Sequence, residues 1–473
     1  MLVCLTSLGR KAPTGACQPG FRIVGLCMFY LRNFKNFSQA ELDFDRPTTL
    51  ILGPNGSGKS NLIEAVELLS FLASGHRLHE VTDIGREGQI EIRGGLEAGA
   101  KIGHDQFTLG YKGNVVLQTR VVPTEVVYEI TVRVRPDPRI IGEMLQVEGR
   151  HIPMFEILPQ EGETASADNQ VRYDNNARGR NKPVESIAAD RSALSQYSRF
   201  AHGNNELSEC LTVIEAVMTT LASPSVFDPI PRLMRGYERR TETQLARNGY
   251  NISPVLLDLQ LDRPVIKPQA EGPPKRVIAN QREVLKRILG RIAQLPDEPF
   301  ASFDFIRMPK VGDVMFGFKL ANREEIIDAR LLSDGTLRAL AILTALETSK
   351  GGSRLILEEF DNGVHPSRVP VMALALFDCA SRNGLHVIAT THNPATMNAL
   401  TNEQLNAVLL VVSDQENNTA RLVRLHELPG CVELVESGRL GDLVTRRIYE
   451  QHLRPDYEKE RQKGIDEWVN SLT

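Results

Sequence analysis

Residues 53–60 read Gly-Pro-Asn-Gly-Ser-Gly-Lys-Ser and complete the pattern G-x-x-x-x-G-K-S, a phosphate-binding loop or P-loop. The apolar run at 49–52 predicts a buried strand before the loop, and residues 61–69 predict a helix with an apolar face after it. This combination creates an anion site, because backbone N–H groups and the helix dipole both point at the phosphate. The loop therefore predicts an α/β nucleotide-binding core.

The P-loop also predicts which side chains bind ATP and Mg²⁺. Lys59 would reach the β- and γ-phosphates, and the Ser60 hydroxyl would bind Mg²⁺. Gln89, in a later β-rich segment, is a further candidate ligand for Mg²⁺, with an exposed strand residue as the alternative interpretation. The residues that we expect to contact ATP are Gly53, Pro54, Asn55, Gly56, Ser57, Gly58, Lys59, Ser60 and Asn61.

The net charge and the cysteine content indicate which cellular compartment and which partners to expect. The 473-residue chain has a formal net charge of −4, which excludes a global positive field that would draw the whole protein onto nucleic acid or a membrane. Its 6 cysteines are scattered without C-x-x-C pairs, so we expect reduced structural thiols rather than a zinc site or a disulfide framework. No apolar run approaches the length of a membrane span. We therefore expect a cytoplasmic protein with no membrane partner.

Changes in the hydrophobic period divide the chain into segments. Alternating apolar residues before about residue 134 predict antiparallel strands, a helical period begins near residue 203, and an α/β pattern returns after Pro296. The expected segments are a disordered extension at 1–20, the N-terminal half of an α/β head with a β subdomain at 21–200, a helical insert at 201–296, the C-terminal half of the head at 297–430 and a helical tail at 431–473.

A second buried strand, predicted at 355–359, ends in the carboxylates Glu358 and Glu359. The carboxyl ends of parallel strands open onto the ligand crevice, so both acids would emerge beside the P-loop. Glu358 would then hold Mg²⁺, and Glu359 would orient and deprotonate an attacking water. A solvated acidic turn is the alternative interpretation.

Two further segments gain meaning from their order along the chain. Residues 332–336, Leu-Ser-Asp-Gly-Thr, stand directly before a predicted helix and would form a second anion site, although the segment taken alone favours an ordinary N-cap. His392 ends a predicted strand at 385–391 and would donate to the γ-phosphate or to the attacking water. A polar surface residue is the alternative interpretation of His392.

Taken in order, these motifs resemble the ATP-binding-cassette (ABC) class of ATPases, and the match is closest to its RecF/SMC-like branch, which includes the ATPase portions of OLD-family proteins. The opening segment 30–37 is similar to the first strand and turn of that branch. The matching segments are 53–60 for Walker A, 332–336 for the ABC signature, 355–359 for Walker B, 361–366 for the D-loop and 391–394 for the switch histidine. The resemblance implies an α/β ABC-type P-loop head with a mixed core sheet, an antiparallel β subdomain and a helical insert.

The resemblance also implies a homodimer with ATP at its interface. Each ATP would be held by the P-loop of one chain and by the signature of the other, and the signature residues are Ser333, Asp334, Gly335 and Thr336. Lys59, Glu359 and His392 would be the catalytic residues. Three positions depart from the usual pattern: Glu358 replaces an aspartate, Asp334 replaces a glycine, and Thr336 stands where Gln or Glu is common.

Three functions fit an ATP-controlled association. The first, which we favour, is a sensor or regulator subunit in a DNA-directed process such as anti-phage defence, working with a separate nuclease or toxin. The second is a RecF-like DNA repair clamp acting alone, and the third is a non-enzymatic scaffold that sequesters an effector. Direct DNA binding would use basic residues, although charge runs usually mark solvated faces. The candidate phosphate contacts are Arg172, Arg178, Arg180, Lys182, Arg235 and Arg239.

Overall fold

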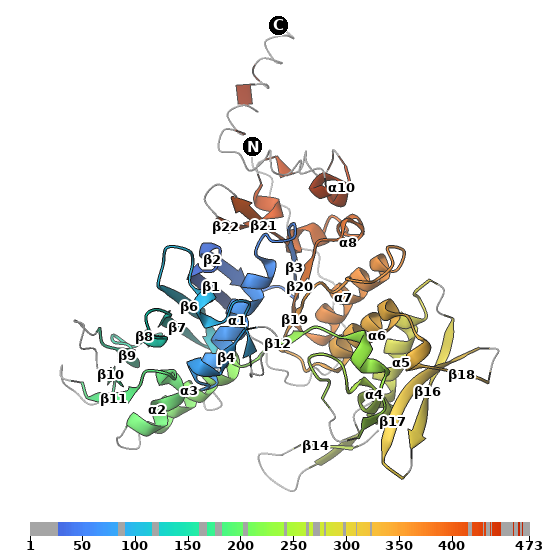
Figure 1. Cartoon of the computed structure of the whole chain (residues 1–473), viewed down its shortest axis with the longest axis horizontal. Helices are drawn as coiled ribbons and strands as arrows, with labels where there is room; N and C mark the ends of the chain where they lie inside the picture. The colour runs from blue at the N-terminus through green and yellow to red at the C-terminus, as the bar shows by residue number, and fades with distance from the viewer. Residues whose placement is uncertain are drawn as a thin grey trace, which may run out of the picture.

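The P-loop strand lies inside the parallel part of one large mixed sheet (Figure 1). In the computed structural model, β3 (Thr48–Leu52) is buried at all five residues, and its parallel neighbours are β20 (His386–Thr391) and β21 (Val408–Asp414). Next to β20 come β19 (Arg354–Leu357) and the edge strand β12 (Pro224–Phe227), both parallel. The predicted strands at 49–52 and 385–391 are therefore confirmed, whereas the strand predicted at 355–359 ends at Leu357 and its two carboxylates lie in the turn that follows.

The structure describes most of the chain between residues 27 and 445. The described residues are 27–83, 90–115, 123–159, 168–175, 182–201, 207–240, 244–261, 264–267, 275–278, 281–296, 299–308, 310–321, 324–414, 419–428, 430–431, 436, 438–445, 457, 462–463 and 466. The expected extension at 1–20, Gln89, Arg178, Arg180 and most of the expected tail at 431–473 lie outside them.

The antiparallel half of the sheet is a meander that continues directly from the core. Each strand pairs antiparallel with the next in the order β2, β1, β6, β7, β8, β9, β10, β11. The junction is a parallel pairing of Phe37 on β2 with Ala420 on β22 (Thr419–Arg424), which itself pairs antiparallel with β21. The bounds are β1 (Cys27–Phe34), β2 (Phe37–Asp43), β6 (Gln106–Val115), β7 (Thr124–Arg133), β8 (Arg139–Val147), β9 (Phe155–Ile157), β10 (Asp168–Tyr173) and β11 (Val184–Ala188).

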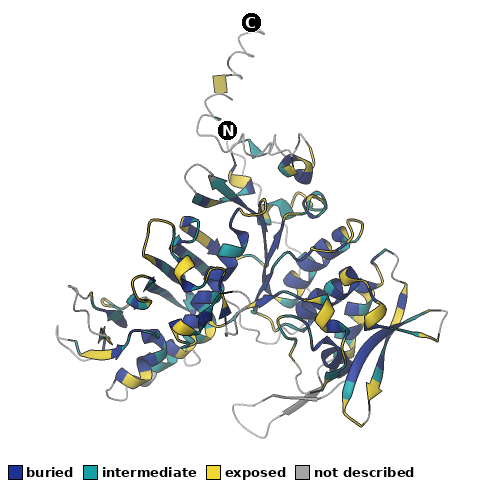
Figure 2. Cartoon of the chain, in the orientation of Figure 1, coloured by how far each residue is buried: buried dark blue, intermediate teal, exposed yellow. Residues whose placement is uncertain are grey.

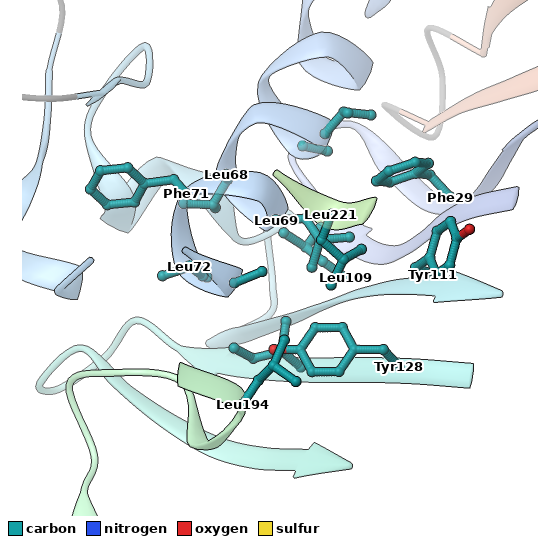
Figure 3. Close-up of a cluster of buried hydrophobic side chains, with 14 of the residues drawn as sticks. Phe29, Leu68, Leu69, Phe71, Leu72, Leu109, Tyr111, Tyr128, Leu194 and Leu221 are labelled. Atoms are coloured by element: carbon teal, nitrogen blue, oxygen red, sulfur yellow. The ribbon is translucent and has the colours of Figure 1, made fainter. Parts of the chain in front are cut away.

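Two hydrophobic cores pack against this sheet, and β3 contributes to both because successive side chains on a strand point to opposite faces. Ile51 lies in the first core, whereas Leu50 and Leu52 lie in the second. The first core joins the antiparallel strands to α1 (Lys59–Ala73), α2 (Ala193–Phe200) and α3 (Leu207–Leu221), and Figure 3 shows part of it. Figure 2 shows buried residues concentrated along the strands and the inner faces of the helices.

The second core is mainly helical and includes the other functional segments. It contains α4 (Ile252–Gln260), α5 (Gln281–Ile292), α6 (Asp334–Thr348), α7 (Val369–Asn383), α8 (Pro394–Asn398) and α10 (Leu440–Thr445). A small sheet packs on α4 and is made of β13 (Glu238–Arg239), β16 (Phe300–Met308), β17 (Asp313–Leu320) and β18 (Ile326–Asp328). Two further strand pairs are β4 (Val81–Thr82) with β5 (Ile90–Glu91), and β14 (Pro264–Lys267) with β15 (Lys275–Ile278).

The architecture confirms the predicted fold class, an α/β ABC-type head with a mixed core sheet and antiparallel strands. The segment 201–296, for which we expected a helical insert, contributes α3 to the first core and α4 and α5 to the second. It also supplies β12, which closes one edge of the large sheet. Four residues that begin with proline carry too little alternation to predict such a strand. Within the described residues, every helix is too short or too polar to cross a membrane.

Candidate nucleotide-binding site

The P-loop has a backbone that only glycine accommodates at two points. Gly56 and Gly58 have φ angles of 78° and 115°, a region that side chains disfavour. A Cβ at Gly58 would also lie 2.7 Å from the Asn36 Nδ2 atom. At Gly53, a Cβ would lie 2.7 Å from Ser57 Oγ and 3.0 Å from the Val411 carbonyl oxygen. The loop is therefore closely packed against its neighbours, and its shape depends on the absence of side chains.

Two asparagines support the P-loop from outside. Asn36, in the turn between β1 and β2, donates from Nδ2 to the Ser57 carbonyl oxygen at 2.9 Å. Asn61, in the first turn of α1, donates from its amide to Asn36 Oδ1 at 2.7 Å. Asn36 belongs to the 30–37 segment, but no local pattern indicates its role in the site, because its partner lies 21 positions further along the chain.

Lys59 points back into the loop. Its Nζ donates to the carbonyl oxygens of Gly53 at 2.7 Å and Pro54 at 3.0 Å, and the residue is 6 % exposed. Burial lowers the pKa of the ammonium, whereas the negative charges of Glu359 and Glu358 oppose that change. The positive charge is thus held within the loop, where phosphate oxygens could replace the carbonyl groups as its acceptors.

Ser60 and Glu358 are far apart in the sequence but in contact in the fold. The Ser60 hydroxyl donates to Glu358 Oε1, although 298 positions separate the two residues. Oxygen ligands of this kind suit Mg²⁺, which keeps several waters and takes only one or two protein carboxylates or hydroxyls. Ser57 Oγ, inside the same loop, is buried and has no hydrogen-bond partner among the described residues. This set of donors fits a Mg²⁺–triphosphate group.

Glu359 has an unusual backbone that its neighbours hold in place. Its φ angle is 43°, in the left-handed region, and its N–H donates to Thr390 Oγ1 at 2.8 Å. One carboxylate oxygen accepts from Asn362 Nδ2 at 3.2 Å, and the other lies 3.3 Å from His392 Nδ1. Glu359 also faces a depression lined by Asn55, Gly56, Gly58, Lys59, Ser60, Asn61 and Arg93.

The structure therefore brings together the catalytic residues predicted from three separate motifs, Lys59, Glu359 and His392. It adds Arg93, which sequence reasoning missed. Arg93 donates from Nε to Glu64 at 2.6 Å and from Nη2 to Asn61 Oδ1 at 3.1 Å, and its side chain is about half exposed. A lone arginine after the two-residue strand β5 carries no pattern that could have indicated this position.

The signature segment begins α6 as an N-cap. Ser333 Oγ accepts from the Thr336 N–H at 3.1 Å and lies 2.7 Å from the Thr336 hydroxyl, to which Arg368 also donates at 2.9 Å. A Cβ on Gly335 would lie 2.8 Å from the Gly363 carbonyl oxygen, so the signature contacts the D-loop segment. Within the described residues, none of positions 333–336 lines the depression beside the P-loop of the same chain.

Each described residue in the predicted DNA-contact set has an acidic partner in the chain. Arg235 contacts Asp334 at 2.6 Å, and Arg239 lies 3.7 Å from Asp313. The other two ion pairs are Arg172 with Glu156 at 2.5 Å and Lys182 with Asp174 at 2.8 Å. These four side chains are on different parts of the surface and do not form one described cluster, because Arg172 and Lys182 belong to the antiparallel half and the others to the second core.

The fold and this site resemble those of the nucleotide-binding heads of RecF/SMC-like ABC-type ATPases, and two family models match parts of the chain. Residues 29–97 match a family described as an AAA domain. Residues 243–398 match a family described as "AAA domain, putative AbiEii toxin, Type IV TA system". The two matched segments include Walker A in one and the signature, Walker B and the histidine in the other.

Curated relatives resemble the chain over short segments. The DNA replication and repair protein RecF of Acaryochloris marina is 44 % identical over 64 residues, which are 14 % of this chain and 17 % of that protein. RecF of Nostoc punctiforme is 38 % identical over 85 residues, 18 % of this chain and 22 % of that protein. The matched segments thus span only 17 % and 22 % of these relatives' own lengths.

Solved structures with a similar backbone fold include SMC heads. An SMC head bound to the C-winged helix domain of ScpA covers 84 % of this chain and 96 % of its own, with 14 % identity and a TM-score of 0.42. The SMC head domain from Thermotoga maritima covers 84 % of this chain and 98 % of its own, with 12 % identity and a TM-score of 0.38.

Proposed function

We propose that this protein binds Mg²⁺–ATP between two copies of the chain and hydrolyses it to ADP and phosphate. The observation that carries the proposal is the convergence of Lys59, Ser60 with Glu358, and Glu359 with His392 at the carboxyl ends of neighbouring parallel strands. A nucleotide-binding scaffold without turnover would not need a carboxylate held in the left-handed backbone region and aimed at the P-loop depression.

The side chains divide the reaction between them. Glu359 would accept a proton from water as the water oxygen bonds to the γ-phosphorus, and the bond to the β,γ-bridging oxygen breaks with its electron pair leaving on ADP. His392, 3.3 Å from Glu359, would orient that carboxylate and the water. Lys59 would position the β- and γ-phosphates. When bound through Ser60 and Glu358, Mg²⁺ would neutralise charge on the phosphate oxygens.

The proposed partner is a second copy, since the signature residues do not line the depression beside their own P-loop among the described residues. Ser333 and Gly335 of one chain would complete the site formed by Lys59 and Ser60 of the other. Splitting the site makes hydrolysis depend on association, because phosphoryl transfer depends mostly on positioning and charge stabilisation. ATP would close the dimer, and hydrolysis would open it.

The substitution Glu359→Gln tests the reaction and the dimer together. The variant should still bind ATP, remain in an ATP-dependent dimer by analytical ultracentrifugation, and lose turnover by about a hundredfold or more, since the proton acceptor is gone. Glu185→Gln, on the exposed part of β11, makes the same chemical change away from the site and should behave as the wild type. ATP turnover by Glu359→Gln at the wild-type rate would refute the assignment.

For the biological role, we propose a sensor or regulator subunit in a DNA-directed process, with anti-phage defence through a separate nuclease or toxin as the specific case. The support is the match of residues 243–398 to a family whose description includes a toxin–antitoxin system. A RecF-like DNA repair clamp acting alone is the second candidate, favoured by the short matches to RecF proteins.

Purification from the native context, followed by ATPase assays with and without DNA, separates the two roles. A nuclease or toxin that co-purifies supports the first. DNA-stimulated turnover by the isolated protein, with DNA binding that weakens steeply as salt rises, supports the second. Salt-independent DNA binding would argue against phosphate contacts by the basic residues in either role.

A further inference from the structure

Arg235 and Asp334 form an ion pair at the entrance to the signature. Arg235 ends the short helix η3 (Pro231–Arg235), and its Nη2 donates to Asp334 Oδ1 at 2.6 Å and to the Leu332 carbonyl oxygen at 2.8 Å. The two hydrogen bonds place the guanidinium beside the first residue of α6. Sequence reasoning put these residues in unrelated roles, Arg235 as a DNA contact and Asp334 as a signature residue.

The pair resolves an electrostatic conflict in the signature. The N-terminus of α6 favours an anion, because the first N–H groups of a helix are unpaired and its dipole is positive there. Asp334 already places a carboxylate at that position, and its side chain is 70 % exposed. An approaching triphosphate would meet that negative charge at short range. The Arg235 guanidinium, with its side chain 27 % exposed, cancels the charge locally.

The surface around the Arg235–Asp334 ion pair also exposes apolar side chains to solvent. Leu331, two residues before Ser333 in η4 (Ala329–Leu331), is 72 % exposed. Ile230 and Leu233, which precede Arg235, are 43 % and 36 % exposed. Helix η3 lies against both η4 and α6, so these side chains and the ion pair belong to one part of the surface. A second chain that brings its P-loop to Ser333 would cover them.

We propose that Arg235 is a positioning residue of the ATP-dependent dimer, which neutralises Asp334 so that the signature can receive the triphosphate held by the facing chain. The inference rests on the proposed function, because it assumes that the signature acts on the other copy. It assigns Arg235 to the nucleotide interface instead of to DNA.

The test measures dimer dissociation constants by sedimentation at saturating ATP and Mg²⁺, with every variant in the Glu359→Gln background. Arg235→Ala should weaken the dimer by about tenfold or more, since it leaves Asp334 facing the phosphates unpaired. Asp334→Asn should leave the dimer as tight as its parent or tighten it. The double variant Arg235→Ala/Asp334→Asn should return to within about threefold of the parent, because the charge that needs neutralising has been removed.

Two controls fix the interpretation. Arg239→Ala removes a nearby arginine that is 69 % exposed and 3.7 Å from its own partner Asp313, and it should leave the dimer constant unchanged. The weakening caused by Arg235→Ala should also shrink as salt concentration rises, because ions screen an exposed charge. ATP binding to the single chain, followed with a fluorescent ATP analogue, should be the same in all variants.

Each outcome has a distinct meaning. A double variant as weak as Arg235→Ala alone would overturn neutralisation, because Arg235 would then act on the nucleotide or the fold directly. A weaker dimer in Asp334→Asn would overturn it even if Arg235→Ala failed to fold. If the Glu359→Gln parent itself does not dimerise with ATP, the proposed function fails, and the inference fails with it. If the parent dimerises and Arg235→Ala dimerises equally well, the inference alone is refuted.

Discussion

Thr390→Val should disturb the position of Glu359 without touching the nucleotide. Thr390 lies near the end of β20, is 1 % exposed, and accepts the Glu359 N–H on its hydroxyl at 2.8 Å. Valine has almost the same shape but no oxygen, so the substitution leaves the partly buried Glu359 N–H without its acceptor. The backbone of Glu359, at a φ of 43°, then loses a bond that holds it in a disfavoured region.

The expected effect on stability follows from that single lost acceptor. An unsatisfied buried donor costs about 1–3 kcal/mol, and relief of the left-handed backbone would recover part of this by moving Glu359. The carboxylate would then leave its place 3.3 Å from His392. A displacement of about 1 Å at a catalytic group can lower a rate by about a hundredfold. We therefore expect a loss of ATP turnover of about ten- to hundredfold.

Thr49→Val is the matched control on the neighbouring strand β3. Thr49 is 2 % exposed, and its hydroxyl has no hydrogen-bond partner among the described residues. The same replacement there removes a buried hydroxyl that makes no bond, so stability should stay within about 0.5 kcal/mol or rise. Urea unfolding gives the free energies, and a phosphate-release assay gives turnover. Equal stability and equal turnover in the Thr390 and Thr49 variants would refute the role assigned to the Thr390 hydroxyl.

Three further substitutions test the fold, one of them beside the signature. Burial raises the pKa of Glu143 to about 7, although the carboxylate accepts hydrogen bonds from the Ala193 and Leu194 N–H groups. Because the pKa is higher in the folded protein, the stabilisation by Glu143 is present below about pH 4.5 and is lost as the pH rises to about 7. Relative to Glu143→Gln, the wild type should therefore lose on the order of 3 kcal/mol between pH 4.5 and 8 in urea unfolding, and a parallel pH profile would contradict this. Gly335→Ala places a Cβ 2.8 Å from a carbonyl oxygen and should lower the free energy of unfolding by about 1–3 kcal/mol. The same substitution should weaken the ATP-dependent dimer, as measured by sedimentation. The control Gly290→Ala, in helix α5 with no atom within 4 Å of the new Cβ, should raise the free energy of unfolding by about 0.5–1 kcal/mol. A Gly335→Ala dimer as tight as the parent would contradict the assigned contact.

The parts of the fold that could be predicted are those that local sequence patterns determine. The P-loop, the strand before Glu358 and the strand before His392 are each set by a continuous apolar run followed by a polar turn. Such runs predict buried parallel strands, whose carboxyl ends gather at one edge of the sheet. That rule was sufficient to expect Lys59, Glu359 and His392 in one place, although they are separated by as many as 333 positions.

The contacts that could not be predicted join segments with no shared period. Nothing local indicates that Asn36 supports the P-loop, that Arg93 faces it, or that Thr390 holds Glu359, because each contact is decided by how distant strands pair. Asp334 could be recognised as a departure from the usual signature. Its partner Arg235, 99 positions earlier, could not, since η3 follows the short edge strand β12 that the sequence failed to indicate.

The same long-range contacts bear on how two ATP sites would communicate. Arg338, on α6 just after the signature, donates to Asp228 Oδ1 at 2.8 Å and to the Glu358 carbonyl oxygen at 3.3 Å. Gly335 lies directly against Gly363, which follows the turn that carries Glu358 and Glu359. Glu358, the proposed Mg²⁺ ligand of one site, and the signature proposed to act on the other are thus joined through one arginine and one backbone contact. If the signature acts on the second copy, a change at Glu358 would reach the facing nucleotide through α6 by way of the Arg338 hydrogen bonds.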